Sequence, residues 1–316
     1  MNMLFIKKNY VFFFFFFSTL IAQDISGKVV FSYSYSDDED VINGFGLKRA
    51  YLSIDKKISD DLSFKFLTDI DPKSSPQDVY IKNAKVDWKT LNGKVVIGLQ
   101  GMNMFKIQEG NWGKRYLDKT VMDRFGYSSS ADMGVGYYGS NSIFSYSVLL
   151  TNGAGYKKSE TDSYKKTSLQ FVYGNTNLSE SDGFNFGTVL SYEPYKREGE
   201  VGIPEEPIGK HEKRVLGIFG AYAKDNLRVG MEWNQLNDSG LLDGNYNDSL
   251  TSIYCNYDLE SSKNLFLKYD MVSGNKDTNY FLAGLEFNPT KGLMIAPHLR
   301  SNDGTSEAGV NFQFKF

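Results

Sequence analysis

The chain has 316 residues, enough for one large domain or two ordinary ones, and its 35 basic and 38 acidic residues nearly balance. This balance gives no electrostatic reason to expect a nucleic-acid partner. The single cysteine, Cys255, excludes a disulfide within the chain, and with only two histidines, His211 and His298, we expect no metal centre or other cofactor. Aromatic residues make up 15% of the chain, and 30 Gly against 7 Pro is typical of strands separated by turns.

The first 22 residues have the pattern of a secretory signal peptide. Lys7 and Lys8 precede an apolar stretch, residues 10–22, which contains six consecutive phenylalanines and ends at Ala22. The alternative is an N-terminal membrane anchor, but this apolar run of about 12 residues is shorter than the roughly 20 that a spanning helix needs. We therefore predict export with cleavage after Ala22, which leaves residues 23–316 as a single domain.

Polar and apolar residues alternate in sixteen segments of the remaining chain, and no segment has a convincing helical periodicity. The last segment is the clearest, because Ala308, Val310 and three phenylalanines alternate with small or polar residues up to Phe316. Alternation of this kind predicts half-buried strands. In chain order the predicted strands are residues 25–35, 45–57, 62–70, 79–88, 94–101, 132–139, 143–151, 165–173, 184–193, 213–223, 227–236, 249–258, 264–272, 279–287, 293–300 and 308–316.

The connections between the predicted strands fall into two classes that alternate along the chain. Short turns, such as residues 91–93, are followed by longer polar connections, such as residues 152–163. Tight turns at one end, long loops at the other and an even number of strands are typical of an outer-membrane β-barrel. A soluble β-sandwich is the alternative, but the charged face of the strands is better explained by the water-filled lumen of a 16-stranded barrel. The sequence therefore predicts an all-β, transmembrane antiparallel β-barrel.

Several segments resemble bacterial porins. Residues 49–53, 62–66 and 95–100 are similar to the N-terminal half of these proteins, most closely the phosphate-selective porin O and P family, and residues 109–134 resemble the inward-folded third loop and following strand of related porins. The resemblance implies a homotrimer in the bacterial outer membrane. It also implies that the C-terminal aromatic residues, Phe312, Phe314 and Phe316, are the signal that barrel-assembly machinery recognises. A dense arginine ladder is missing, so phosphate selectivity is not carried over.

The longest connection, residues 102–131, holds five basic and three acidic residues, a net charge of +2. Its length is unusual for a segment without structure of its own, and in a pore it would fold inward and narrow the lumen. An external loop with solvated charges is the alternative. We predict the inward fold, with Trp112, Tyr116 and Phe125 packed against the barrel wall. Charges at a narrow constriction act strongly on ions, and this one is predicted to contain Lys106, Glu109, Lys114, Arg115, Asp118, Lys119, Asp123 and Arg124.

The alternation places further charges on the lumen face of the strands. Those singled out as lumen-lining are Arg49, Lys65, Lys85, Arg228, Glu232, Lys268 and Arg300. Basic residues on this face outnumber acidic ones nine to six, counting Lys28, Arg49, Lys65, Lys85, Lys94, Arg228, Lys268, Arg300 and Lys315 against Asp55, Asp69, Asp87, Glu232, Asp270 and Glu286. Because both this surplus and that of the long connection are positive, we predict a weak preference for anions.

Together these features predict a porin, a water-filled channel for passive diffusion of small hydrophilic solutes and ions, and not an enzyme. The expected partners are outer-membrane lipid and lipopolysaccharide, the barrel-assembly machinery, further copies of the chain, and the permeating solutes or anions. One alternative is a non-channel barrel that acts in adhesion or as a structural protein. Another is a barrel hydrolase, which needs a His beside a Ser or Asp at the rim, and neither His211 nor His298 has such neighbours in sequence. The acidic run at residues 37–40 is predicted to be a solvated loop, the alternative being a site for divalent cations or lipopolysaccharide.

Overall fold

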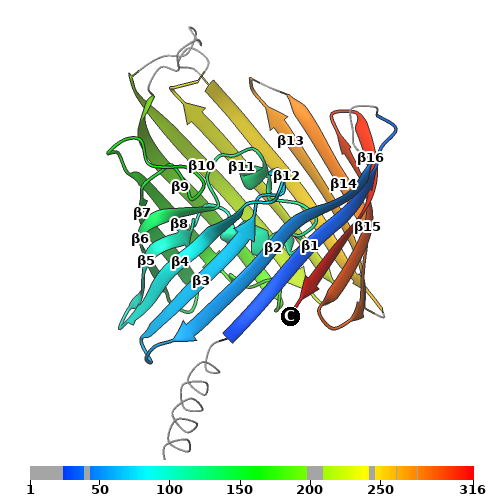
Figure 1. Cartoon of the computed structure of the whole chain (residues 1–316), viewed down its shortest axis with the longest axis horizontal. Coiled ribbons are helices and arrows are strands. Elements are labelled where there is room, and N and C mark those ends of the chain that lie inside the picture. Colours follow the sequence, from blue (N-terminus) through cyan, green and yellow to red (C-terminus); the bar gives the residue numbers. More distant parts are fainter. Residues whose placement is uncertain (1–23, 39–42, 198–208, 242–245, 261, 276) are drawn as a thin grey trace, which may run out of the picture.

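The structure is a closed barrel of sixteen antiparallel strands (Figure 1). The computed structural model describes residues 24–38, 43–197, 209–241, 246–260, 262–275 and 277–316. Each strand is hydrogen-bonded to its neighbours in sequence, and the first strand is paired with the last. The predicted fold class and strand number are therefore confirmed. The predicted signal peptide, residues 1–22, and the acidic residues Glu39 and Asp40 lie outside the described residues.

Every predicted strand range overlaps one observed strand. The largest differences are in β9 and β10, whose pairing continues through polar residues up to Arg197 and Gly209. In these residues polar and apolar side chains no longer alternate, but the backbone hydrogen bonds between the two strands continue. The strands are β1 (Asp24–Tyr35), β2 (Gly44–Lys57), β3 (Leu62–Ile70), β4 (Val79–Thr90), β5 (Gly93–Gly101), β6 (Ala131–Ser140), β7 (Phe144–Thr151), β8 (Lys166–Gly174), β9 (Gly183–Arg197), β10 (Gly209–Lys224), β11 (Leu227–Asp238), β12 (Tyr246–Leu259), β13 (Lys263–Ser273), β14 (Thr278–Thr290), β15 (Leu293–Asn302) and β16 (Thr305–Lys315).

Pairing of β1 with β16 closes the barrel. The register runs over eight residue pairs, from Lys28 opposite Lys315 to Tyr35 opposite Ala308. On the outer face, the rings of Phe31 and Phe312 stack with their centroids 4.9 Å apart across this seam. Closure gives every strand two partners, so the sheet has no edge at which backbone hydrogen-bonding groups stay unpaired.

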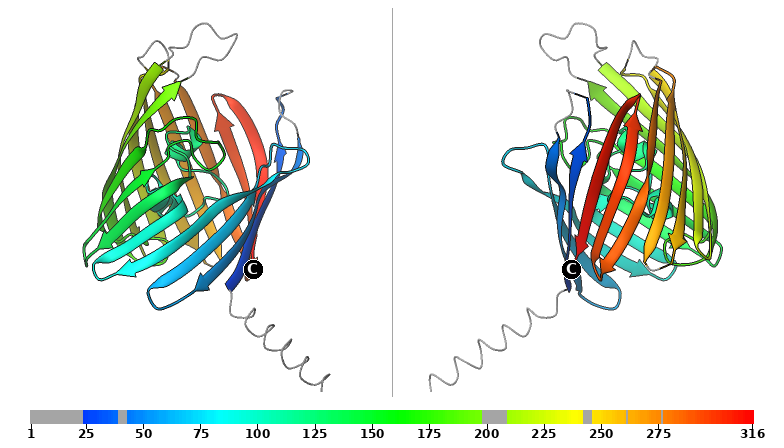
Figure 2. Two further views of the ribbon diagram at one scale, coloured as in Figure 1. Left: turned by 60° about the vertical axis from the view of Figure 1, so that its left-hand side comes forward. Right: turned by 90° about the vertical axis from the view of Figure 1, so that its right-hand side faces the viewer.

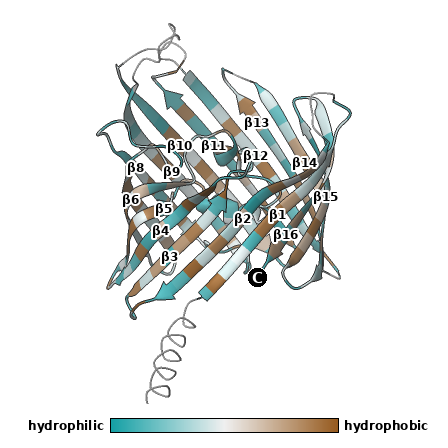
Figure 3. Cartoon of the chain, in the orientation of Figure 1, coloured by the Kyte–Doolittle hydropathy of each residue, from teal (hydrophilic) through white to brown (hydrophobic). Residues whose placement is uncertain are grey.

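The two faces of the barrel wall differ in polarity, as the period of two requires. On β12, Ser252, Tyr254 and Asn256 are buried inside the barrel, whereas Ile253 and Tyr257 are exposed on the outer surface. Bands of hydrophilic and hydrophobic residues alternate along the strands in Figure 3. The outer wall is thus apolar, as a lipid-facing surface must be.

Two short helices, α2 (Lys106–Trp112) and α3 (Val121–Arg124), lie between β5 and β6. The sequence does not predict these helices, because seven and four residues are too few to establish a period of 3.6. Gly113 ends α2 in a left-handed conformation with φ 71°, and its N–H donates to the carbonyl oxygen of Glu109 over 2.9 Å. Within the described residues, no helix is both long enough and apolar enough to span a membrane.

Replacing Ile253 by Arg tests which face meets lipid. Ile253 lies in the middle of β12, is 52% exposed, and is flanked on the outer wall by Met231 and Tyr269. We expect Ile253→Arg to lower the free energy of unfolding in lipid vesicles by about 2–4 kcal/mol, because a guanidinium would enter the hydrocarbon.

The matched control is Asn83→Arg, in which the new charge faces the water-filled interior. We expect that variant to change the unfolding free energy by less than about 1 kcal/mol. Urea titration monitored by tryptophan fluorescence measures both, and equal losses in the two variants would contradict the assignment of faces.

Candidate functional site

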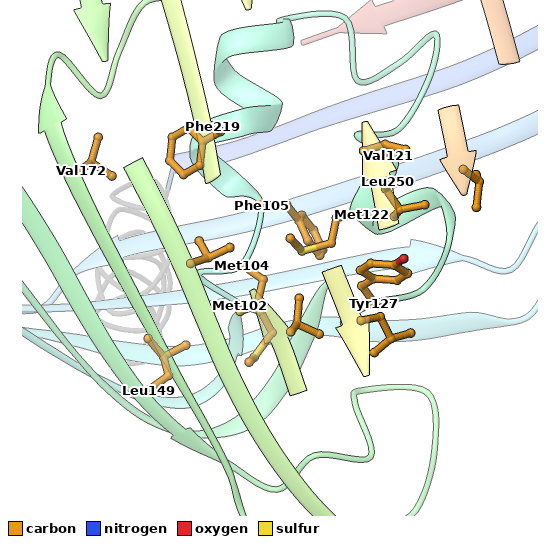
Figure 4. Close-up of a cluster of buried hydrophobic side chains, with 14 residues drawn as sticks. Met102, Met104, Phe105, Val121, Met122, Tyr127, Leu149, Val172, Phe219 and Leu250 are labelled. Atoms are coloured by element: carbon orange, nitrogen blue, oxygen red, sulfur yellow. The ribbon is translucent and has the colours of Figure 1, made fainter. Parts of the chain in front are cut away.

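The segment between β5 and β6, residues 102–130, packs against inward-facing side chains on the opposite side of the barrel; we call it the interior segment. It lies within the ring of strands in both views of Figure 2. Its apolar residues pack in one cluster with a belt of wall residues from seven consecutive strands, β7 to β13 (Figure 4). The belt consists of Leu149, Val172, Val189, Val215, Phe219, Leu236, Leu250 and Val272. The interior segment contributes Met102, Met104, Phe105, Val121, Met122 and Tyr127.

A second apolar cluster forms around Trp112. This side chain is 0% exposed, and its ring lies edge-on to Tyr254 and Phe266, at centroid distances of 5.5 and 6.5 Å. Tyr116 is also buried in this cluster. Phe125, which we expected to pack against the wall as well, is 36% exposed, because it lies just past the C-terminus of α3, where the helix ends.

Side-chain amides anchor the interior segment to four strands. Asn103 donates to the hydroxyl of Ser147 over 2.9 Å, and Asn111 and Asn185 exchange hydrogen bonds of 2.8 and 2.9 Å. Asn256 and Asn311 each donate to a carbonyl oxygen of the segment, those of Trp112 and Tyr116. These bonds satisfy polar groups that would otherwise be buried without partners, which is costly.

An ion pair anchors the segment to β14. The ammonium of Lys114 lies 2.8 Å from one oxygen of Glu286, and the Tyr116 hydroxyl donates to the other over 2.6 Å. Both charged side chains are nearly inaccessible to water. Burial and the neighbouring carboxylate of Glu286 raise the pKa of Tyr116, so the phenol keeps its proton for this bond.

Two of the eight predicted constriction charges, Asp118 and Arg124, are neutralised in a network beneath the segment. Lys268 contacts Asp118 over 2.7 Å, the Lys119 carbonyl oxygen over 2.7 Å and Asp270 over 2.8 Å. Arg124 pairs with Asp118, and its guanidinium lies 3.5 Å from the centre of the Tyr280 ring. This network fixes the segment, and its charges do not line either of the two cavities described below.

Arg115 lies outside this network and faces open space. Its guanidinium is held by Glu109 at 2.5 Å and Asp123 at 2.7 Å, and Asp123 also pairs with Lys119 at 3.2 Å. Burial alone would lower the pKa of Arg115, but the two carboxylates raise it. Arg115 is therefore a fixed positive charge at the surface of the interior segment.

Between the interior segment and the wall formed by β1–β5 lies a cavity of about 650 Å³, which we call the basic cavity. Eight basic residues and one acidic residue line it. The basic ones are Lys28, Lys65, Lys82, Lys85, Lys94, Lys106, Arg115 and Lys315, and the acidic one is Glu109.

A second cavity of about 470 Å³, which we call the neutral cavity, adjoins it. Five basic residues, Lys28, Lys114, Arg115, Arg228 and Lys315, and five acidic residues, Glu180, Asp182, Asp225, Asp258 and Glu286, line it. Three residues line both cavities, Lys28, Arg115 and Lys315, and all three are basic. Lys28 and Lys315 are direct neighbours across the β1–β16 seam.

The turn at residues 175–182 forms part of the wall of the neutral cavity. It is longer than the other short turns, and Leu178, at its centre, is 1% exposed and packs on Ala221 and Ala223 of β10. Arg228, one of the predicted lumen residues, donates to the carbonyl oxygen of Ser179 over 3.2 Å. The turn therefore covers part of the interior at the end of the barrel where β8 and β9 meet.

The other predicted lumen residues are placed as follows. Lys65 pairs with Asp55 and Lys85 with Asp87, each at 2.8 Å, and both lysines line the basic cavity. Four predicted lumen residues line neither cavity. Arg49 pairs with Asp69 at 2.9 Å, and Arg300 contacts His298. Glu232 and Lys268 are buried under the interior segment.

Two lysines reach the interior through β-bulges. The register of β4 against β3 skips Lys82, and that of β2 against β1 skips Lys48. A bulge lets two consecutive residues face the same side, so Lys82 and Asn83 both line the basic cavity. Strict alternation from Lys85 assigns Lys82 to the outer wall, so the sequence pattern does not predict that Lys82 faces the interior.

The histidines contact backbone carbonyl groups. His211 lies 3.1 Å from the carbonyl oxygen of Ser239, whose hydroxyl instead accepts a bond from the Glu212 N–H, and His298 lies 3.0 Å from the carbonyl oxygen of Ala296. Among the described residues, no group of three His, Cys, Asp or Glu side chains is placed to hold a metal ion.

No protein-family model matches the chain, and no curated protein matches it. Solved structures do match. OmpF of Salmonella typhi in complex with daunomycin is 14% identical, with a TM-score of 0.66 over 93% of this chain and 97% of that one. OmpT, an outer membrane protein of Vibrio cholerae, in its trimer form is 15% identical, with a TM-score of 0.67 over 93% and 99%. An anion-selective porin from Comamonas acidovorans is 12% identical, with a TM-score of 0.67 over 93% and 99%. The chain thus has the fold of bacterial outer-membrane porins, and the narrower resemblance to the phosphate-selective porin O and P family stays a prediction.

Proposed function

We propose that the chain is an outer-membrane porin through which small hydrophilic solutes diffuse, with a preference for anions. The observation that carries this proposal is the charge at the junction of the two cavities, where Lys28, Arg115 and Lys315 line both. A solute that moves from one cavity to the other passes these three cations. The anion-selective porin named above shares the fold, which supports the proposal.

The placement of carboxylates explains why the preference is for anions. Five of the eight basic residues of the basic cavity form salt bridges, among them Lys82 with Asp69 at 3.6 Å and Lys94 with Asp87 at 3.5 Å. The other three, Lys28, Lys106 and Lys315, form no salt bridge within the described part of the chain. Because screening in physiological salt extends over about 8 Å, these nearby charges act on an ion in the cavity, and distant loop charges do not.

We further infer the setting in which such a channel works. Residues 1–22 would direct export as a cleaved signal peptide, and Phe312, Phe314 and Phe316 would be recognised by the barrel-assembly machinery. Three copies would associate in the outer membrane in contact with lipid and lipopolysaccharide. The trimer form of the similar Vibrio cholerae protein supports this assembly, and light scattering in mild detergent measures it.

Removing the junction charges tests the selectivity. The double variant Lys28→Gln, Lys315→Gln deletes two of the three cations that line both cavities, without changing the segment that carries Arg115. We expect its anion-to-cation permeability ratio, from the reversal potential in a salt gradient across a planar bilayer, to fall by a factor of about 3.

The control for this experiment is Lys291→Gln, which removes a lysine exposed on the turn between β14 and β15. Its reversal potential should equal that of the unmodified protein. If the control and the double variant shift equally, selectivity comes from total charge and the proposed junction is wrong.

Loosening the interior segment tests its effect on pore size. Trp112→Ala removes the side chain that joins the segment to Tyr254 and Phe266, a truncation that costs about 3–5 kcal/mol in a packed core. The barrel keeps its own strand ladder, so we expect folded protein with a larger single-channel conductance. The control is Trp88→Ala, on the exposed surface of β4, which should leave the conductance unchanged. If the conductance of Trp112→Ala also stays unchanged, the segment does not limit flow.

A further inference from the structure

The basic cavity has apolar surfaces that a passage for hydrophilic solutes does not need. Leu67 of β3 and Val96 of β5 line it from the barrel wall, and Met102 and Phe105 line it from the interior segment. Phe105 also joins the apolar cluster of Figure 4, so its position is fixed. Val96, Met102 and Phe105 are each only 2% exposed, so the apolar side chain that a solute can still cover is that of Leu67, which is half-buried. Covering such a surface is favourable.

Aromatic rings extend this apolar surface and organise the cations around it. Tyr51 stands between Lys28 and Lys82, with each ammonium 4.8 Å from the ring centre, and Lys82 donates to the Tyr51 hydroxyl over 2.9 Å. Tyr138, below Lys94 at 5.5 Å, and Phe316 also line the cavity. The lysines nearest the apolar surface are therefore held in place by rings rather than by carboxylates alone.

Cations without a salt bridge lie on both sides of the apolar surface. Lys28 and Lys315 lie at the β1–β16 seam, whereas Lys106 lies at the start of α2, near β5. Burial lowers the pKa of Lys106, and the like charges of Lys85 and Lys94 lower it further. An anion bound here would relieve this repulsion, because opposite charges at short distance attract.

We propose that the basic cavity is a binding site for aromatic carboxylates, which pause there as they cross the barrel. The carboxylate would pair with the ammonium groups that lack salt bridges, and the ring would cover Leu67 and Tyr51, which are both partly exposed in the cavity. A volume of about 650 Å³ lies in the range of small-molecule sites. This inference rests on the proposed channel function for its role in transport, but the binding itself can be measured without ion flow.

Current recordings on the full chain in planar bilayers provide the first test. Benzoate, added to one side, should interrupt the chloride current with a longer mean closed time than acetate, which has the charge without the ring. Benzyl alcohol, which has the ring without the charge, should cause no interruptions. Equal closed times for benzoate and acetate would overturn the proposed site while leaving the proposed channel intact.

A polar substitution in the apolar surface separates the two halves of the site. In the variant Leu67→Ser, we expect the benzoate closed time to fall about fivefold, since covering apolar area drives that part of binding, with acetate unaffected. Lys28→Gln should shorten the benzoate closed time and leave the apolar surface as it is. The turn variant Lys291→Gln should leave both closed times unchanged.

Calorimetric titration of benzoate into the purified barrel in detergent, with empty micelles as the blank, measures the same site without a pore. If the barrel does not conduct but benzoate binds and Leu67→Ser weakens that binding, the channel function is wrong and the site stands. If benzoate binds no better than acetate in the titration, the site is wrong whatever the currents show. Mobility on gels before and after heating shows whether each variant is a folded barrel. If Leu67→Ser does not fold, Lys28→Gln is used in its place.

Discussion

The internal arrangement of this barrel depends on where its interior segment packs. The segment leaves β5 and covers an apolar belt on β7 to β13, and the part around Trp112 packs on apolar residues of β12 to β15 and on Val30 of β1. Beneath the segment, side chains are buried and charges are paired. Polar side chains of β1 to β5 line the basic cavity instead. One packing interaction thus decides which charges are structural and which are available to a solute.

Burial imposes different rules on the two sets of charges. Beneath the segment, Lys268, Asp118, Asp270 and Arg124 lie in mutual contact, as charges removed from water require. Removing one member would leave the others without a partner in a region of low dielectric, so this network resists substitution for reasons of stability. In the basic cavity, water and mobile ions can take the place of a missing partner. An excess of one sign is tolerable there, and Lys28, Lys106 and Lys315, which have no salt bridge within the described residues, line this cavity.

The sequence predicts most of the strands because successive wall residues face lipid and the interior in turn. Side-chain polarity therefore alternates with a period of two. It predicts the interior segment less well. The belt residue Leu149 is followed by Leu150, which faces outward, and two consecutive apolar residues give no sign of which one a loop will cover. Lys82 shows a different limit of prediction from sequence. A single extra residue in β4 reverses which side of the wall the preceding residues of that strand face. The register of a neighbouring strand decides such a bulge, and that information is not local. The charge of the cavity, by contrast, could be anticipated in sign from the count of residues on the inner face.

In the proposed channel, the two adjoining cavities have a consequence for the direction of flow, because they differ in fixed charge. Under one voltage polarity, anions would be driven from the neutral cavity into the basic one and accumulate there, which raises the local carrier concentration. Under the other polarity, the basic cavity would be depleted faster than the neutral cavity supplies it. A pore with this charge profile would carry more anion current at one voltage polarity than at the other. The long turn at residues 175–182, which contributes Glu180 and Asp182 to the neutral cavity, would then influence the degree of this rectification.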